Sequence, residues 1–299
     1  MQRAVKDVTD TGLLERIAAG ERHFSKGQRL IAVFIRQHYD RAAFMTANRL
    51  GKVVGVSEST VVRFAVELGY DGYPSMQRAL RGMIRNRLTA VQRLEVAQDR
   101  LGRGDMLRGV IQSDIENLRA TLEELDRDAF SASVEAILRA RQVYILGVRS
   151  SAALASFLSF YLHLLCDNVR LVSPSSVSDI FEQVLRVGPE DLVIGFSFPR
   201  YSRRTVRAMR YAHDRGATLV AITDSKLSPL IEVATYTLLT HSDMISFVDS
   251  LVSPLSLINA LVVEIGMRKQ QEAAQTFDAL EQIWDEYEVY EKEIYEKNE

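Results

Sequence analysis

The 299-residue sequence contains a single cysteine, Cys166, so no disulfide can form within one chain. Such low cysteine usage is typical of a reducing compartment, and we expect a cytoplasmic protein. The apolar runs are interrupted by serine, histidine and charged residues before they reach the length of a membrane-spanning helix. The first ten residues, MQRAVKDVTD, lack the apolar core of a signal peptide. Cys166 lies in the apolar stretch SFLSFYLHLLCDN, which favours a buried structural thiol over a nucleophile.

Histidine is also scarce, and the five histidines do not form a recognisable catalytic or metal-binding pattern. None lies in a loop at the end of a predicted strand with an evident carboxylate partner, which a catalytic base would need. His163 and His213 fall inside predicted helices, and His241-Ser242-Asp243 reads as a polar loop more readily than as a site. The sequence therefore predicts no catalytic residue, no metal and no cofactor. It favours a binding protein over an enzyme.

The balance of charge differs between the two ends of the chain. Residues 1–95 contain 16 Lys and Arg against 9 Asp and Glu, whereas the whole chain has a net charge of −2. A basic amino-terminal part on an acidic body is typical of a protein that meets nucleic acid at one end.

The stretch Thr46–Tyr70, TANRLGKVVGVSESTVVRFAVELGY, has the pattern of two short helices joined by a tight turn. Thr46 and Ser57 are the expected N-caps, and Gly55 stands where the chain has to turn. An arginine and short hydroxyl side chains lie off the apolar stripe of the second helix, as they do in a helix that enters the major groove of DNA. The candidate DNA-contacting residues are Thr46, Ser57, Ser59, Thr60, Arg63 and Tyr73.

An ordinary helical hairpin packed on a core is the alternative for this stretch. The helix expected next, up to about residue 88, contains four arginines: Arg78, Arg81, Arg85 and Arg87. They form either a solvated face or a second contact with the DNA backbone. Helices are also predicted at 12–20 and 25–39, which completes an all-helical head.

From residue 141 the pattern changes to short β-rich runs that alternate with helical stretches. Strands are expected at 142–147, 168–172, 191–196, 217–223 and 234–240, with helices at 150–166, 176–187 and 202–215. This alternation predicts a parallel sheet covered by helices on both faces. Ligands bind such sheets beyond the carboxyl ends of the strands.

Two strand-end loops carry the residues expected to bind an anion. Both loops bring hydroxyls and an arginine to the start of a helix, where free N–H groups favour negative charge. The candidate ligand-binding residues are Gly147, Arg149, Ser150, Ser151, Ser197, Arg200, Ser202 and Thr205. Asp249-Ser250, which is expected to open a long final helix, is a third candidate.

The order of these parts resembles the RpiR/MurR family of bacterial regulators, and VSESTVVRFAVELGYDGYP is similar to the family's recognition-helix motif. The resemblance implies α + α/β architecture: a helix-turn-helix domain (1–88), a helical linker (89–125) and a three-layer sugar isomerase (SIS) domain with a parallel sheet (126–299). Arg149 replaces the second glycine of the usual G-x-G-x-S loop. In the usual S-x-S-G-x-T loop, three extra residues precede Ser202 and Arg203 replaces the glycine. The added charge suggests a smaller or more acidic ligand than an amino-sugar phosphate.

The resemblance also implies a function and partners: a repressor of carbohydrate catabolism genes that binds operator DNA and senses a phosphorylated sugar or sugar acid. An isomerase-type enzyme with a nucleic-acid-binding head is the alternative. The carboxyl-terminal stretch favours a homodimer or homotetramer, because its apolar residues follow helical spacing: Phe277, Leu280, Ile283, Trp284, Tyr287 and Tyr290. This face packs either on its own domain or on a second copy.

Overall fold

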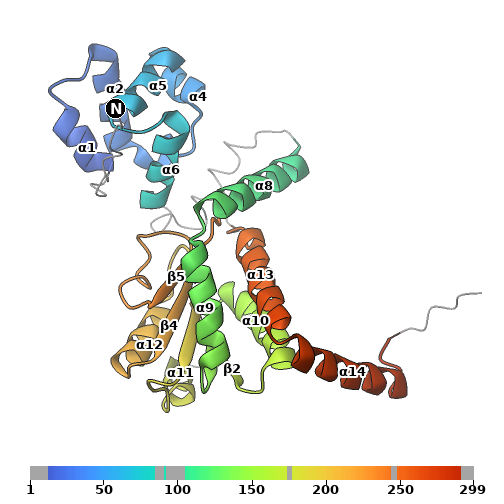
Figure 1. The fold of residues 1–299 in the computed structure, drawn as a ribbon. Coiled ribbons are helices and arrows are strands. Elements are labelled where there is room, and N and C mark those ends of the chain that lie inside the picture. The colour runs from blue at the N-terminus through green and yellow to red at the C-terminus, as the bar shows by residue number, and fades with distance from the viewer. Residues whose placement is uncertain (1–12, 85–90, 92–104, 174–176, 244–247, 291–299) are drawn as a thin grey trace, which may run out of the picture. The chain divides into compact units, whose positions relative to one another are not determined.

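The computed structural model describes residues 13–84, 91, 105–173, 177–243 and 248–290. The chain divides into two compact units. The first extends to Val110 and takes in Met244–Val248, and the second contains the rest. In Figure 1 the first unit runs from blue to teal and the second from green to red. No helix among the described residues is long and apolar enough to cross a membrane.

The first unit is all-helical. It contains α1 (Leu13–Gly20), α2 (Lys26–Gln37), α3 (Tyr39–Ala42), α4 (Ala47–Val54), α5 (Glu58–Glu67) and α6 (Tyr73–Ile84). The core forms because apolar side chains recur at helical spacing, with Ile31, Ile35, Leu50 and Phe64 fully buried. The expected helix over 25–39 ends at Gln37, and the four-residue α3 after it was not predicted.

The second unit contains a five-stranded parallel sheet with the order β2-β1-β3-β4-β5. Its strands are β1 (Val143–Gly147), β2 (Val169–Val172), β3 (Leu192–Phe196), β4 (Thr218–Thr223) and β5 (Tyr236–Leu239). All five lie within the runs expected from the sequence. Most strand positions are buried, because helices cover both faces of the sheet.

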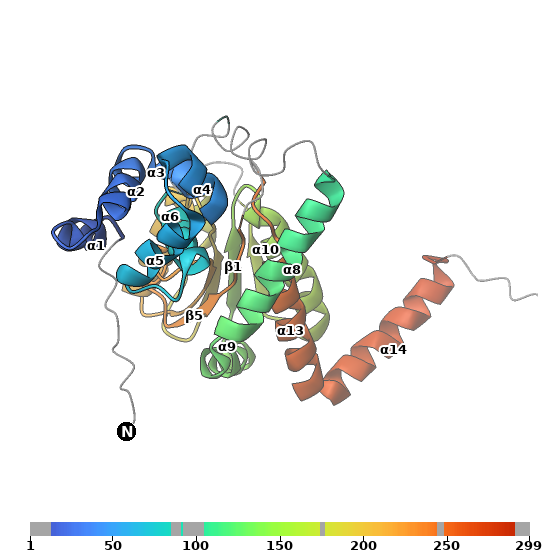
Figure 2. The same ribbon diagram turned by 90° about the horizontal axis from the view of Figure 1, so that it is seen from above.

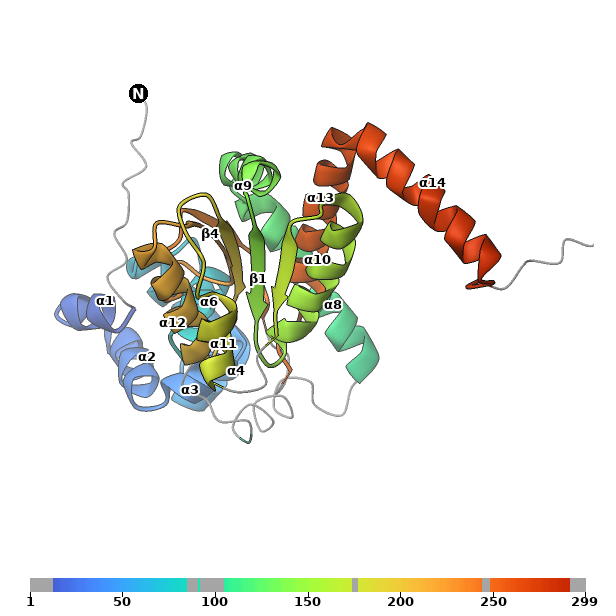
Figure 3. The same ribbon diagram turned by 90° about the horizontal axis from the view of Figure 1, so that it is seen from below.

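Two separate cores lie on the two faces of the sheet (Figure 3). On one face pack α9 (Arg127–Arg139), α10 (Ser151–Leu165) and α13 (Val252–Arg268). On the other face pack α11 (Val177–Gln183) and α12 (Arg203–Asp214). The three-layer α/β prediction is therefore confirmed. Preceding α9 is α8 (Met106–Glu124), which meets it at a sharp turn around Leu125 (Figure 2).

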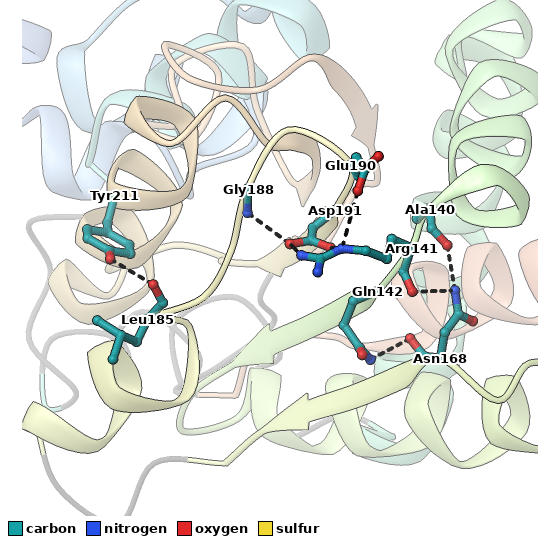
Figure 4. Close-up of polar contacts among 9 residues, drawn as sticks. All are labelled: Ala140, Arg141, Gln142, Asn168, Leu185, Gly188, Glu190, Asp191 and Tyr211. Carbon is teal, nitrogen blue, oxygen red and sulfur yellow. Dashed lines mark hydrogen bonds and ion pairs between the residues drawn. The ribbon is translucent and has the colours of Figure 1, made fainter.

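An ion pair between the exposed Arg141 and the buried Asp191 links the residues just before β1 and β3, at the amino ends of the strands (Figure 4). The Asp191 carboxylate is fully buried and accepts two bonds from Arg141, at 3.0 and 2.7 Å, and one from Gly188 N at 2.8 Å. These contacts, above all the hydrogen bond to Asp191, raise the pKa of the Arg141 guanidinium. These contacts stabilise the amino ends of β1 and β3. The candidate ligand-binding residues lie at the opposite end of the sheet.

The carboxyl-terminal part forms two helices instead of the expected single long one. The first, α13, begins at Val252 rather than at Asp249, and α14 (Gln270–Glu286) follows it after Lys269. Lys269 breaks the helix, and its ammonium group donates to Leu165 O at 2.7 Å. Beyond this point α14 leaves the body of the domain (Figures 1 and 3), and only Ala273 along it is buried.

Candidate functional site

The helix-turn-helix has the local geometry that its sequence predicts. Thr46 Oγ1 accepts from Arg49 N at 3.2 Å, and Ser57 Oγ accepts from Thr60 N at 3.3 Å, so both residues are N-caps. Gly55 adopts the left-handed conformation with φ 80°. Gly51 completes the turn, since a Cβ there would lie 2.7 Å from the carbonyl oxygen of Val56. The two helices can approach this closely only because residue 51 has no side chain.

The first turn of α5 presents a cluster of small polar groups. Ser57 Oγ lies 2.9 Å from Ser59 Oγ and 2.8 Å from Thr60 Oγ1. Arg63 Nε donates to Ser59 O at 3.3 Å, which draws the guanidinium towards the start of the helix. Ser57, Ser59 and Arg63 are exposed, and so is Thr46 on α4. Thr60 is half-buried, and its methyl group faces Gly27 of α2.

The structure separates Tyr73 from these residues. Its side chain is only 4% exposed, and its hydroxyl donates to Met45 O at 2.6 Å. The side chain therefore joins α6 to the segment before α4, and we assign it to the core of the head rather than to its DNA surface. Among the arginines expected along α6, Arg78 is exposed. The side chain of Arg81 and residues Arg85 and Arg87 lie outside the described residues.

The candidate ligand-binding residues gather at one point of the sheet. Gly147, the last residue of β1, is paired with Phe196, the last residue of β3. The loops after these two strands therefore start side by side. They then diverge, because α10 covers one face of the sheet and α12 covers the other. This is the point where the strand order reverses, and a crevice for a ligand forms there in sheets of this order.

Both loops contain an arginine with an unusual backbone conformation. Arg149 has φ 58° and Arg200 has φ 65°, in the left-handed region that glycine adopts most readily. Arg149, which stands where the G-x-G-x-S pattern has its second glycine, thus adopts a conformation typical of glycine. Gly147 cannot be replaced in the same way, because a Cβ there would lie 2.4 Å from Ser151 O. Strained residues of this kind concentrate at binding sites.

The start of α10 has no side-chain cap, although Ala152 N and Ala153 N donate to Arg149 O and Ser150 O at 3.1 and 3.4 Å. Ser150 stands at the N-cap in a helical conformation, and its side chain makes no capping hydrogen bond. Ser150 and Arg149 are exposed, whereas Ser151 is buried. The first N–H groups of a helix attract an anion unless a side chain satisfies them.

The start of α12 is held by two serines. Ser202 caps the helix by accepting from Arg204 N and Thr205 N, and its own N–H donates to Ser197 Oγ at 3.3 Å. Thr205 is fully buried, yet its Oγ1 has no hydrogen-bond partner. A buried hydroxyl without a protein partner is uncommon, and it is free to bond to a water molecule or a ligand.

Sequence reasoning missed several hydroxyls at the same edge of the sheet. Thr240, directly after β5, and Ser253, in the first turn of α13, are also fully buried with unpartnered hydroxyls. Thr223, at the end of β4, donates to Ser197 O at 2.6 Å and lies 2.8 Å from Ser228 Oγ. The available signal was the polar residue that directly follows an apolar strand, such as Thr240 after β5.

One histidine has a carboxylate partner that the sequence did not indicate. His241 Nε2 lies 3.0 Å from Glu124 Oε2, so this histidine does have a carboxylate partner, which comes from α8. His163 Nδ1 lies 2.7 Å from Ser159 O within its own helix. Cys166 is buried, and desolvation raises the pKa of its thiol, which disfavours the nucleophilic thiolate. The described residues contain no group of three His, Cys, Asp or Glu that could hold a metal ion.

Comparisons with known proteins agree with both halves of this description. Residues 11–87 match the model of the helix-turn-helix domain of the rpiR family, and residues 136–264 match the SIS domain. The chain belongs to the RpiR family. An uncharacterised HTH-type transcriptional regulator of Clostridium perfringens is 21% identical over 88% of this chain and 95% of its own length.

Two solved structures show the same fold. The sugar isomerase domain of the RpiR transcription factor from Sphaerobacter thermophilus is 32% identical, with a TM-score of 0.56 over 59% of this chain and 98% of that one. The NanR protein of Vibrio vulnificus, solved in complex with ManNAc-6P, is 22% identical, with a TM-score of 0.55 over 91% of this chain and 97% of that one. The architecture of this RpiR-family chain thus supports a sugar-responsive transcription regulator.

Proposed function

We propose that this RpiR-family protein is a cytoplasmic repressor of carbohydrate catabolism genes, controlled by a phosphorylated sugar or sugar acid. The observation that carries the proposal is the pair of sites on one chain. An exposed hydroxyl-and-arginine cluster lies on the recognition helix, and two loops that carry hydroxyls and arginines follow β1 and β3 at the switch point of the sheet.

In the DNA complex, α5 lies in the major groove. Ser59 and Arg63 reach base edges, while Thr46 and Ser57, at the helix N-termini, lie against phosphates. Thr60 contributes its hydroxyl from the half-buried side of the helix. Two copies of the head read the two halves of a palindromic operator.

At the switch point, the phosphate or carboxylate of the effector lies between the N-termini of α10 and α12. Ser150, Ser151, Ser197, Ser202 and Thr205 supply hydrogen bonds, and Arg149 and Arg200 supply charge. The two arginines favour a more acidic ligand than the amino-sugar phosphate found in NanR. Effector and operator must affect each other's affinity by the same factor.

The DNA site is tested on a duplex selected from a random pool. We expect Arg63→Ala to weaken binding by about tenfold to a hundredfold, and Ser59→Ala to weaken it less. Arg36→Ala is the matched control, because Arg36 is an exposed arginine of the same head that pairs with Glu21. Equal losses for Arg63→Ala and Arg36→Ala would show that only the charge of the head matters.

The ligand site is tested by calorimetry with hexose 6-phosphates, amino-sugar 6-phosphates, 6-phosphogluconate and neutral sugars. We expect an anionic member to bind and Thr205→Val to weaken that binding, because valine keeps the shape of threonine but not its hydroxyl. Tight binding of a neutral sugar would contradict the proposal.

An isomerase is the second candidate, and the contact between His241 and Glu124 is the observation that favours it. Turnover of a ketose or aldose phosphate by the full chain, abolished by His241→Asn, would replace the regulator proposal at this site.

A further inference from the structure

One face of α8 carries four polar side chains that hold the segments after β5 and before α13. Asp114, Asn117, Thr121 and Glu124 follow a spacing of three, four and three residues, which places them on one side of the helix. We call these four residues the α8 clasp.

The clasp holds the segment after β5 through three residues. Asn117 Nδ2 donates to Asp243 O and Asn117 Oδ1 accepts from Asp243 N, both at 3.2 Å. Thr121 Oγ1 accepts from His241 N at 2.8 Å. Glu124 Oε2 lies 3.0 Å from His241 Nε2. Asn117 and Thr121 are buried, so water does not compete for their hydrogen bonds.

The clasp holds the start of α13 through its remaining residue. Ser250 Oγ donates to Asp114 Oδ1 at 2.6 Å and accepts from Val252 N at 3.3 Å. Asp114 thereby positions Ser250, whose hydroxyl accepts from the first residue of α13.

Among the described residues, three buried hydroxyls have no hydrogen-bond partner, and the two segments held by the clasp carry two of them. Thr240 immediately precedes His241, and Ser253 lies three residues after Ser250. A ligand that hydrogen-bonds to Thr240 or Ser253 would therefore act on backbone that is tied directly to α8.

A line of hydrogen bonds also joins the clasp to the loop after β3. Ser202 N donates to Ser197 Oγ, and Thr223 Oγ1 donates to Ser197 O. Thr240 N in turn donates to Thr223 O at 2.8 Å. The next residue along the chain, His241, is bonded to Thr121. Hydrogen bonds across β3, β4 and β5 thus connect α8 to the loop that is proposed to bind the anion.

We propose that the effector site extends to Thr240 and Ser253, and that the α8 clasp transmits the binding of effector at this site to α8. The inference rests on the proposed function of the switch-point loops. It adds how the binding of a ligand there affects α8. The phosphate or carboxylate end of the effector contacts the loops after β1 and β3, and its hydroxyl-bearing end contacts Thr240 and Ser253. Asn117 and Thr121 are positioning residues, because they act through the segment that they hold.

The first test needs no ligand and measures amide hydrogen exchange of residues 112–124 in the full chain. We expect Thr223→Val to speed this exchange at least about threefold, because it removes the link between Ser197 and the β5 end. Ser133→Ala is the matched control. It removes another buried hydroxyl, bonded to Ala129 O within α9, that does not touch either segment. Equal exchange in the two variants would overturn the inference.

The second test adds 6-phosphogluconate, N-acetylmannosamine 6-phosphate or inorganic phosphate. We expect a sugar derivative that binds to slow exchange in α8, and inorganic phosphate, which lacks hydroxyls on a carbon chain, to leave it unchanged. Thr121→Val should abolish the response while inorganic phosphate binds as in the wild type. Glu124→Gln should also reduce the response. Because the Glu124 side chain is largely exposed, this variant tests the clasp even if Thr121→Val misfolds.

The outcomes separate the two proposals. If a sugar derivative binds and α8 does not respond, the clasp inference is wrong and the sensor function stands. If none of the three probes binds to the full chain, the result counts against the proposed sensor, and the exchange in Thr223→Val still decides whether the clasp is connected to β4.

Discussion

Arg149 combines a backbone cost with a proposed binding role. Its left-handed conformation, φ 58°, is about 1 kcal/mol less favourable for arginine than for glycine. The side chain is exposed, so folding gains little from its burial. A residue that weakens the fold at a switch-point loop is best explained by the charge that it brings there.

We therefore expect Arg149→Gly to raise the free energy of unfolding by up to about 1 kcal/mol and to weaken binding of an anionic ligand. Arg149→Ala should weaken binding equally but keep the backbone cost. Chemical denaturation together with calorimetry measures both effects. Unchanged anion affinity in both variants would remove Arg149 from the site.

Asp191 is a residue whose role is purely structural. Replacing Asp191 with alanine leaves Gly188 N without this acceptor and removes the ion pair with Arg141 that links the residues before β1 and β3. We expect Asp191→Ala to lower the free energy of unfolding by about 2 kcal/mol. Glu190→Gln is the control, since Glu190 is exposed and its contact with Arg141 is long, at 3.8 Å. Similar losses in the two variants would contradict this assignment.

At the scale of an element, the turn between α4 and α5 depends on the absence of a side chain at Gly51. The Cβ of an alanine would meet the backbone of Val56, which cannot move aside like a flexible side chain. We expect Gly51→Ala to destabilise the head by about 2 kcal/mol and to weaken DNA binding, while ligand binding by the other unit is unchanged.

Val53→Ala is the matched control for this turn. Val53 lies on the same helix and is 49% exposed, so its truncation should change stability little. Thermal unfolding followed by near-ultraviolet and far-ultraviolet circular dichroism distinguishes the two. An unchanged Gly51→Ala protein would mean that the turn can relax around a methyl group.

The α14 helix contacts α10 and α13, but most of its residues are exposed. Its apolar face was expected to pack either on its own domain or on a second copy. Phe277, Ile283, Tyr287 and Tyr290 are between 40% and 71% exposed. Packing of α14 on its own domain therefore does not cover these side chains. Contiguous exposed apolar residues usually mark a protein interface.

At the scale of the whole molecule, a second copy covering this face would give the homo-oligomer that a palindromic operator requires. We expect the double substitution Ile283→Glu and Tyr287→Ser to shift the protein to a smaller species in sedimentation velocity and to weaken operator binding. Asp278→Asn is the control, because Asp278 lies on the opposite side of the same helix. A wild-type protein that sediments as a monomer would exclude α14 as the oligomer contact.

The sequence by itself determined most of the elements and the class of each unit, but not α3 or the division of the carboxyl-terminal helix into α13 and α14. Cap residues, glycines and apolar spacing are local signals, so Thr46, Ser57 and Gly55 placed the helix-turn-helix, and apolar runs placed all five strands. Such signals do not report what covers a side chain, which is why Tyr73 was expected on the DNA surface and is buried in the core.

Only the tertiary structure decided which hydroxyls are buried near the carboxyl edge of the sheet. Thr205, Thr240 and Ser253 are distant in sequence, and their shared burial without hydrogen-bond partners exists only once the strands are ordered and α13 is in place. The partnership of Glu124 with His241 likewise joins residues 117 positions apart. Long-range pairing depends on how helices pack on the sheet, and no short stretch of sequence encodes that packing.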